Sequence, residues 1–187
     1  MKVSSHAVFE WFARTSIVLI LAVSSYTRAQ QTGQTVEMNH ATASVQSKQL
    51  AVRGLDGKSV TFTLADLAML PHKTISVYNE HTKTNERYSG VELIELLQKV
   101  GTPQGESVKG KLFMTAVVAE GADHYCVIYT LAEVDPSIHT GDVLVADSIE
   151  GHPLDKDGAF KMVSTEERRP ARWVRNLAQI SVINVKP

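Results

Sequence analysis

Short hydrophobic runs recur along residues 48–185 and are separated by Gly, Pro, Asp and Asn, a pattern typical of short strands joined by turns. Asp56-Gly57 lies between two such runs and predicts a hairpin. The run at 112–119 is hydrophobic at successive positions, which predicts a strand buried on both faces. The predicted strands cover residues 49–53, 59–62, 74–78, 112–119, 125–130, 143–146, 159–163 and part of 173–185.

Helical spacing of hydrophobic residues occurs in two segments. Thr63 can cap a short helix over residues 64–70, which Pro71 would end. Residues 91–100 have hydrophobic side chains at intervals of three and four, and this helix is expected to open at Ser89-Gly90. A polar loop is expected over residues 79–87, and a helical turn over 131–135. Mainly short strands with a few short helices predict an α+β fold rather than a doubly wound sheet.

The N-terminal residues have the pattern of an export signal. Positive charges at Lys2 and Arg14 precede a hydrophobic run at 16–25, and the small residues Thr27 and Ala29 suit a cleavage site. We therefore predict a signal peptide over residues 1–29, cleaved after Ala29, and a periplasmic or secreted protein. An uncleaved membrane anchor and a buried helix are the alternatives, although a membrane helix needs roughly 20 apolar residues.

Two further features concern the start of the chain. Residues 30–47 are rich in Gln, Thr, Ser and Ala without sustained periodicity, so we predict a flexible linker that leads into a folded domain at 48–187. The signal segment has no Arg-Arg pair, which argues against the twin-arginine export route. The protein is therefore expected to leave the cytoplasm unfolded.

Charge excludes some partners. The formal net charge is -1, so no general positive field attracts nucleic acid, and membrane contact is expected only through an uncleaved signal segment. The basic residues concentrate at 168–175, where Arg172 and Arg175 are the predicted binding residues for a small anion, because guanidinium groups suit phosphate-like ligands. The alternative is a solvated loop whose arginines pair with Glu166 and Glu167.

The candidate metal ligands and nucleophiles are few. Cys126 is the single cysteine, so no intramolecular disulfide can form, and we expect a small buried side chain rather than a metal ligand. The sequence has no G-x-S-x-G nucleophile motif and no Gly-rich phosphate loop. Histidines without the H-x-x-x-H spacing of helical metal ligands predict no metal site; they are His72, His81, His124, His139 and His152.

Five strings occur in the order found in a known family. They are YSGVELIELL at 88–97, ADHY at 122–125, DVLVA at 142–146, GHPL at 151–154 and ARWVRNL at 171–177. On these strings, residues 48–185 resemble the oxidoreductase molybdopterin-binding domain of the sulfite-oxidase type. The resemblance implies an α+β fold whose short strands and helices surround a molybdopterin pocket.

The same resemblance suggests which residues line that pocket. Arg172 and Arg175 match an arginine and a lysine of the family, and Asp123 and Tyr125 belong to the matched turn. We expect these four residues to bind a cofactor or another small ligand, with the alternative that Asp123 only shapes its turn. Trp173 is expected in the core rather than as a stacking platform.

Three departures from the family pattern weaken the enzyme interpretation. The family's molybdenum is bound by a cysteine thiolate just before the glycine-valine helix, but residues 75–81 contain no cysteine. Asp157 stands where the family has a histidine that contacts the cofactor, and Met162 lies near the position of an arginine. Molybdopterin is therefore a cofactor expected from resemblance alone, and we predict that molybdenum is absent.

Two functions remain open. The first is an exported oxidoreductase-type molybdopterin-binding domain, which would be a sulfite-oxidase-like enzyme if it were active. The second is a non-catalytic periplasmic module that binds a small anionic ligand or a protein partner in the former cofactor pocket. The sequence assigns no catalytic residue and no metal ligand to either.

Overall fold

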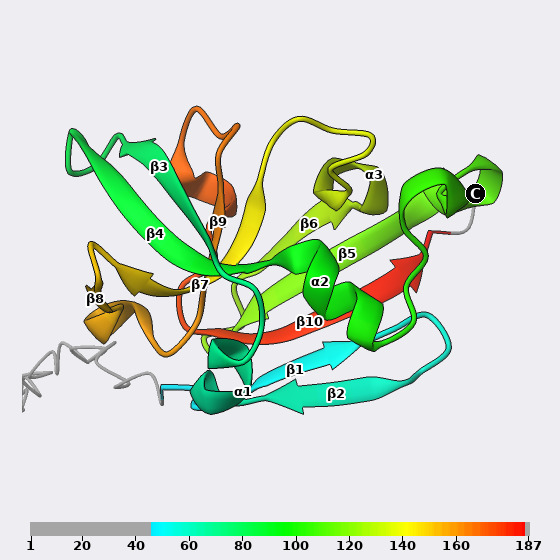
Figure 1. The fold of residues 1–187 in the computed structure, drawn as a ribbon, viewed down its shortest axis with the longest axis horizontal. Helices are drawn as coiled ribbons and strands as arrows, with labels where there is room; N and C mark the ends of the chain where they lie inside the picture. Colours follow the sequence, from blue (N-terminus) through cyan, green and yellow to red (C-terminus); the bar gives the residue numbers. More distant parts are fainter. Residues whose placement is uncertain (1–45, 186–187) are drawn as a thin grey trace, which may run out of the picture. The chain divides into compact units, whose positions relative to one another are not determined.

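The structure, a computed structural model, describes residues 46–185 as two β-sheets with short helices (Figure 1). The predicted signal peptide lies outside the described residues, as does most of the predicted linker. Sheet A contains β1 (Leu50–Arg53), β2 (Ser59–Phe62), β5 (Thr115–Gly121), β6 (Cys126–Thr130) and β10 (Leu177–Asn184). Sheet B contains β3 (Lys73–Asn79), β4 (Thr84–Glu92), β7 (Val143–Ile149), β8 (His152–Pro153) and β9 (Lys161–Ser164).

Short helices connect the strands. The α-helices are α1 (Leu64–Ala68), α2 (Leu93–Lys99) and α3 (Leu131–Val134). The 3-10 helices are η1 (Gly105–Ser107), η2 (Gly110–Met114), η3 (Asp155–Asp157) and η4 (Pro170–Arg172). Thr63 caps α1 as predicted, since its hydroxyl accepts from the backbone of Asp66 and the Asp66 carboxylate accepts from the backbone of Thr63. The mixture of strands and short helices confirms the α+β class.

Sheet A joins the two ends of the described chain. Its strand order is β2-β1-β10-β5-β6, and β10 lies between β1 and β5 (Figure 1). The β1–β10 pair is parallel, with Val52 opposite Ile180, and the other pairs are antiparallel. The last strand thus ties the segment that precedes it, which contains η4, to the first hairpin.

Sheet B is antiparallel and follows the order β3-β4-β7-β8, with β9 also pairing with β7. A large hydrophobic core includes α2, the inner side of sheet A and residues of sheet B such as Val145 and Met162. A smaller core on sheet B contains Tyr88 and Trp173, whose rings meet edge-to-face with centroids 5.8 Å apart. Trp173 is 6% exposed, so its predicted core position is confirmed.

Strand β4 is the main difference from the expected elements. It covers residues predicted as a loop and the first residues predicted as helix, so that α2 begins only at Leu93. Residues at its start are polar, but they pair with β3, with Asn79 opposite Thr84. Its far end pairs with β7 through Val91 and Val145. Cross-strand hydrogen bonding therefore overrides the local helical spacing.

Cys126 is exposed, so the expectation of a buried side chain is wrong. The cause is the position of β6 at the edge of sheet A, where alternate residues face outward. Val127 and Tyr129 point into the core, whereas Cys126 and Ile128 do not.

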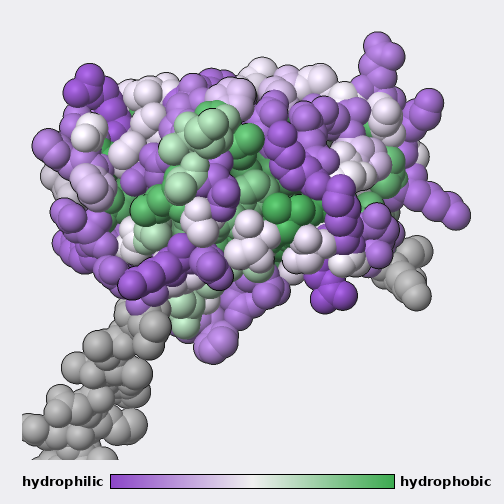
Figure 2. Space-filling view, turned by 60° about the horizontal axis from the view of Figure 1, so that its bottom comes forward, coloured by the Kyte–Doolittle hydropathy of each residue, from purple (hydrophilic) through white to green (hydrophobic). Residues whose placement is uncertain are grey.

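Figure 2 shows hydrophobic surface in the middle of one face of the domain. Among the large hydrophobic side chains exposed in the described range, only Tyr125 lines the cleft beside the β5–β6 turn.

Between residues 46 and 185, no helix has the length and hydrophobicity needed to cross a bilayer.

His72 gives the fold a pH-dependent contact. Its Nε2 lies 2.8 Å from Asp147 Oδ2 and its Nδ1 lies 2.9 Å from the carbonyl oxygen of Leu70. Both partners are acceptors, so both bonds form together only when the imidazole is protonated. The hydrogen bond to Asp147 is the main cause that raises the pKa of His72 above its ordinary value of 6.5.

We therefore expect the His72 contact to stabilise the fold below about pH 6.5 and to be lost as pH rises through the raised pKa of the folded state. The His72 side chain is 29% exposed, so solvent screening keeps the contribution to about 0.5–1 kcal/mol. Urea unfolding of wild type and His72→Gln at pH 5.5 and 8.5 measures it. The difference in unfolding free energy between the two proteins should be larger at pH 5.5. Parallel pH profiles would contradict the assignment.

Candidate functional site

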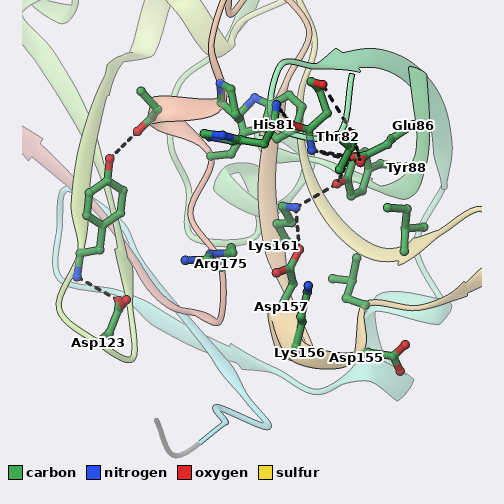
Figure 3. Close-up of a pocket in the computed structure, with 17 residues that line it drawn as sticks. His81, Thr82, Glu86, Tyr88, Asp123, Asp155, Lys156, Asp157, Lys161 and Arg175 are labelled. Atoms are coloured by element: carbon green, nitrogen blue, oxygen red, sulfur yellow. Dashed lines mark hydrogen bonds and ion pairs between the residues drawn. The ribbon is translucent and has the colours of Figure 1, made fainter. Parts of the chain in front are cut away.

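A cleft of about 770 Å³ opens on sheet B beside the β5–β6 turn (Figure 3). Its walls come from the β3–β4 hairpin, the η3 turn, the start of β9, the β5–β6 turn and the segment from η4 to β10. Segments far apart in sequence meet here because β10 pairs with β5 and the backbone of Asn176 donates to the carbonyl of Asp157. This volume falls within the roughly 300–1,000 Å³ of small-molecule sites.

Lys161 supplies a nearly buried charge to the cleft. Its side chain is 7% exposed, and its ammonium donates to Asp157 Oδ2 at 2.6 Å and to the Tyr88 hydroxyl at 2.9 Å. The ammonium also lies 4.7 Å from the centroid of the Tyr88 ring. An unpaired ammonium would be costly at this depth, so the carboxylate and the hydroxyl are what allow Lys161 to remain charged.

The hydrogen bonds continue from Tyr88 to Glu86. The Tyr88 hydroxyl donates to Glu86 Oε2 at 2.7 Å, and Asn79 and Thr82 donate to the same carboxylate at 2.9 Å each. Burial alone would raise the pKa of Glu86, but these hydrogen bonds outweigh it and lower the pKa. Burial, together with the bond to Glu86, raises the pKa of Tyr88. At neutral pH the site therefore contains a hydrogen-bonded row of three groups: the Glu86 carboxylate, the neutral Tyr88 phenol and the Lys161 ammonium.

The β5–β6 turn forms the opposite wall. Asp123 Oδ1 accepts from the backbone of Tyr125 at 3.1 Å, and the Tyr125 hydroxyl donates to the carbonyl of Ala171. Gly121 is required at the start of this turn, because a Cβ there would lie 2.7 Å from Asp123 Oδ1 and 2.9 Å from the carbonyl oxygen of Arg175. Asp123 thus shapes its turn and also lines the cleft.

Arg175 provides an exposed cation to the cleft. The buried residues Trp173 and Val174 precede it, and its exposed side chain lines the cleft. In the view of Figure 3, it lies between Asp123 and the Lys161–Asp157 pair. Within residues 46–185, its guanidinium makes no hydrogen bond or ion pair. Its donors therefore remain available to a ligand.

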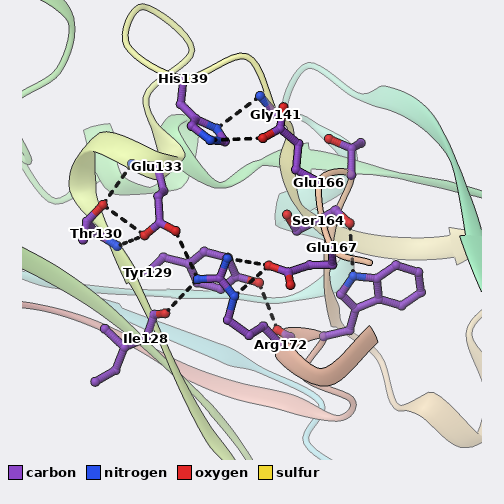
Figure 4. A network of polar contacts seen from close by, with 12 residues as sticks. Ile128, Tyr129, Thr130, Glu133, His139, Gly141, Ser164, Glu166, Glu167 and Arg172 are labelled. Atoms are coloured by element: carbon purple, nitrogen blue, oxygen red, sulfur yellow. Dashed lines mark hydrogen bonds and ion pairs between the residues drawn. The ribbon is translucent and has the colours of Figure 1, made fainter. Parts of the chain in front are cut away.

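Three of the four residues expected to bind a ligand line this cleft, namely Asp123, Tyr125 and Arg175. Arg172, the fourth, does not line the cleft and is paired within the protein. Its Nε donates to Glu167 at 2.7 Å and its Nη1 to Glu133 at 3.2 Å, as Figure 4 shows.

The Arg172 guanidinium also stacks 4.4 Å from the centroid of the Tyr129 ring. Its charge is therefore neutralised by the protein itself. The two arginines diverge because Arg172 ends η4, whereas Arg175 lies three residues beyond it, in the bend that leads into β10.

Lys161 is the residue of the site that the sequence interpretation missed. Met162 was placed near the family's arginine position, but it is 0% exposed in the core, and its neighbour Lys161 lines the cleft instead. The signal was a single charged residue inside the hydrophobic run at 159–163. A lysine in such a run is seldom fully buried without a partner, so its presence indicates a paired and functional position.

The donor atoms do not fit a thiolate-bound molybdenum. Before α2, the cleft is lined by Asn79, His81, Thr82, Glu86 and Tyr88, and none of them carries sulfur. Cys126 faces outward from β6 and does not line the cleft. Across residues 46–185, no three His, Cys, Asp or Glu side chains converge as metal ligands would. Asp157, which stands at the position of the family's histidine, forms an ion pair with Lys161.

Comparison with known proteins gives a likeness to solved structures. No family model matches the chain. No curated protein matches it either. Among solved structures, the sulfane dehydrogenase SoxCD from Paracoccus pantotrophus is similar, with a TM-score of 0.58 and 22% sequence identity. The match covers 75% of this chain but 39% of that chain, so this chain spans well under half of its neighbour's length. The likeness confirms the expected α+β fold of the sulfite-oxidase type.

Proposed function

We propose that this chain is a ligand-binding module with a sulfite-oxidase-like fold, which binds a small anionic ligand in the cleft and performs no molybdenum chemistry there. The observation that carries the proposal is the guanidinium of Arg175, which has no partner among residues 46–185 and lies on the wall of a cleft of about 770 Å³. Tyr125, which is half exposed, adds an aromatic surface to the same cleft.

The chemistry of Arg175 supports an anion rather than a neutral ligand. A guanidinium presents a rigid set of donors that match carboxylate, sulfonate and phosphate oxygens. Two other cations near this region already have carboxylate partners, since Arg172 pairs with Glu167 and Lys161 with Asp157. An anion that enters the cleft therefore meets two cations, Arg175 and Lys156, that form no ion pair within residues 46–185.

The second candidate is a sulfite-oxidase-like enzyme that binds molybdopterin. The fold favours it, because this is the fold that the sequence resemblance predicts. The donor set opposes it, because no thiolate lines the cleft and Asp157 faces the place where an anionic cofactor would need a cation. We therefore place the binding module first.

Titration with benzenesulfonate tests the proposal. This probe combines a tetrahedral anion for Arg175 with a ring for Tyr125. Arg175→Ala should weaken binding at least about tenfold, since a hydrogen bond to a charged group contributes about 1.5–3 kcal/mol. Arg168→Ala is the matched control, because Arg168 is exposed but does not line the cleft, and its affinity should stay that of wild type. Equal affinities of wild type and Arg175→Ala would rule the proposal out.

We also propose that the protein works in the periplasm or outside the cell. This proposal is supported by residues 1–29 alone, and the N-terminal residue of protein recovered from the periplasm tests it.

A further inference from the structure

Asp157 gives the cleft a feature that the unpaired arginine does not explain. It places a carboxylate 2.6 Å from the ammonium of Lys161, the most deeply buried cation of the site. We propose that this carboxylate makes the cleft select ligands whose anionic group carries one negative charge, such as a carboxylate or a sulfonate, over dianionic phosphates. The inference rests on the proposed function, because it specifies the ligand of the same cleft.

Lys161 has capacity for one more acceptor. An ammonium has three N–H donors, and two of them are used by Asp157 and by the Tyr88 hydroxyl. Among residues 46–185, no third acceptor contacts it. The side chain is 7% exposed and lines the cleft, so a ligand oxygen is the partner that the third donor lacks. The anionic end of the ligand is thus expected at Lys161 and Arg175.

The charge around this position limits how much negative charge a ligand can bring. The cleft is lined by the cations Lys156, Lys161 and Arg175 and by the carboxylates Glu86, Asp123, Asp155 and Asp157. Among these seven charged residues, the carboxylates exceed the cations by one. A ligand with one charge can use the directional donors, whereas each further charge is repelled by a lining that is already negative.

Asp157 is the carboxylate best placed to set this preference. Its side chain is 16% exposed, so its field is screened less than that of Asp155, which is exposed. Its backbone is held independently of its charge, because its N–H donates to Leu154 and its carbonyl accepts from Asn176. Asp157→Asn therefore removes the charge and keeps both the backbone hydrogen bonds and a side-chain acceptor for Lys161.

Benzenesulfonate and phenyl phosphate are the probes that separate the two ligand classes. Both place a tetrahedral anion on a phenyl ring, but at pH 8 the sulfonate has one charge and the phosphate about two, because the second pKa of a phosphate monoester is about 6. Their dissociation constants are measured by calorimetry for wild type, Asp157→Asn and Asp155→Asn. Asp155→Asn is the matched control, since Asp155 lines the cleft without contacting Lys161.

Wild type should bind benzenesulfonate more tightly than phenyl phosphate. Asp157→Asn should change the ratio of the two dissociation constants by about tenfold in favour of phenyl phosphate binding. Asp155→Asn should change this ratio by about threefold or less. Tighter binding of phenyl phosphate by wild type, or equal shifts in the two variants, would overturn the inference and leave the proposed function standing. Failure of every folded variant to bind either probe would instead refute the proposed function, and the inference with it.

Discussion

Gly90→Ala is expected to lower the free energy of unfolding by about 3 kcal/mol or more, enough to unfold much of a marginally stable domain. Gly90 lies in β4 at the point where its register with β7 shifts. A Cβ at this position would lie 2.2 Å from the carbonyl oxygen of Val145 and 2.5 Å from Cα of Ala146. Both atoms belong to the backbone of β7, a central strand of sheet B, so neither can rotate away as a side chain would.

Gly141→Ala is the matched control for this prediction. The closest atoms to its added Cβ belong to the side chain of Glu166, at 2.7 Å, and this side chain is exposed, so it can move aside at the cost of its surface contacts with Thr140 and His139. The control should therefore lose less than about 1 kcal/mol. Chemical unfolding of both variants measures the difference. A Gly90→Ala protein as stable as Gly141→Ala would show that β4 and β7 do not approach so closely.

Lys161→Met is expected to have the second largest effect, a loss of about 3 kcal/mol of unfolding free energy. The substitution keeps the hydrophobic part of the side chain but leaves Asp157 without its cation and the Tyr88 hydroxyl without a donor. Breaking a buried pair from one side costs more than replacing both partners, because a desolvated charge remains.

The double variant Lys161→Met with Asp157→Asn tests that explanation. It removes the uncompensated charge, so it should be more stable than Lys161→Met alone, in spite of carrying one more substitution. Chemical unfolding at pH 7 gives both values. If the two substitutions added their losses, the buried pair would not be the source of the effect.

Local signals in the sequence predicted much of the fold. The first hairpin followed from Asp56-Gly57, and the start of α1 from the capping residue Thr63. The parallel pairing of β1 with β10 was not predictable, because it joins residues such as Val52 and Ile180 across almost the whole domain. The start of β4 was missed because its polar residues form a strand only through pairing with β3.

The lining of the cleft could be anticipated where it depends on local geometry. Asp123 and Tyr125 both line the cleft because they belong to one turn. Arg172 was expected beside them but lies outside the cleft, because its partners, Glu133 and Glu167, come from elements that sequence alone cannot bring beside it. Lys161 was missed because the strand was matched to the family pattern one residue out of register. A shift of one residue exchanges the side of a strand that faces the core with the side that faces the cleft.

The central claim is that this fold binds its ligand without molybdenum, and the metal content of the purified protein tests it most directly. The full chain should be produced in a host that makes the molybdenum cofactor and is supplied with molybdate, and then analysed for molybdenum. Because no thiolate lines the cleft, we predict molybdenum far below one atom per chain, with no change in Cys126→Ser. Close to one molybdenum atom per chain would contradict the account, and its loss in Cys126→Ser would identify the thiolate that binds it.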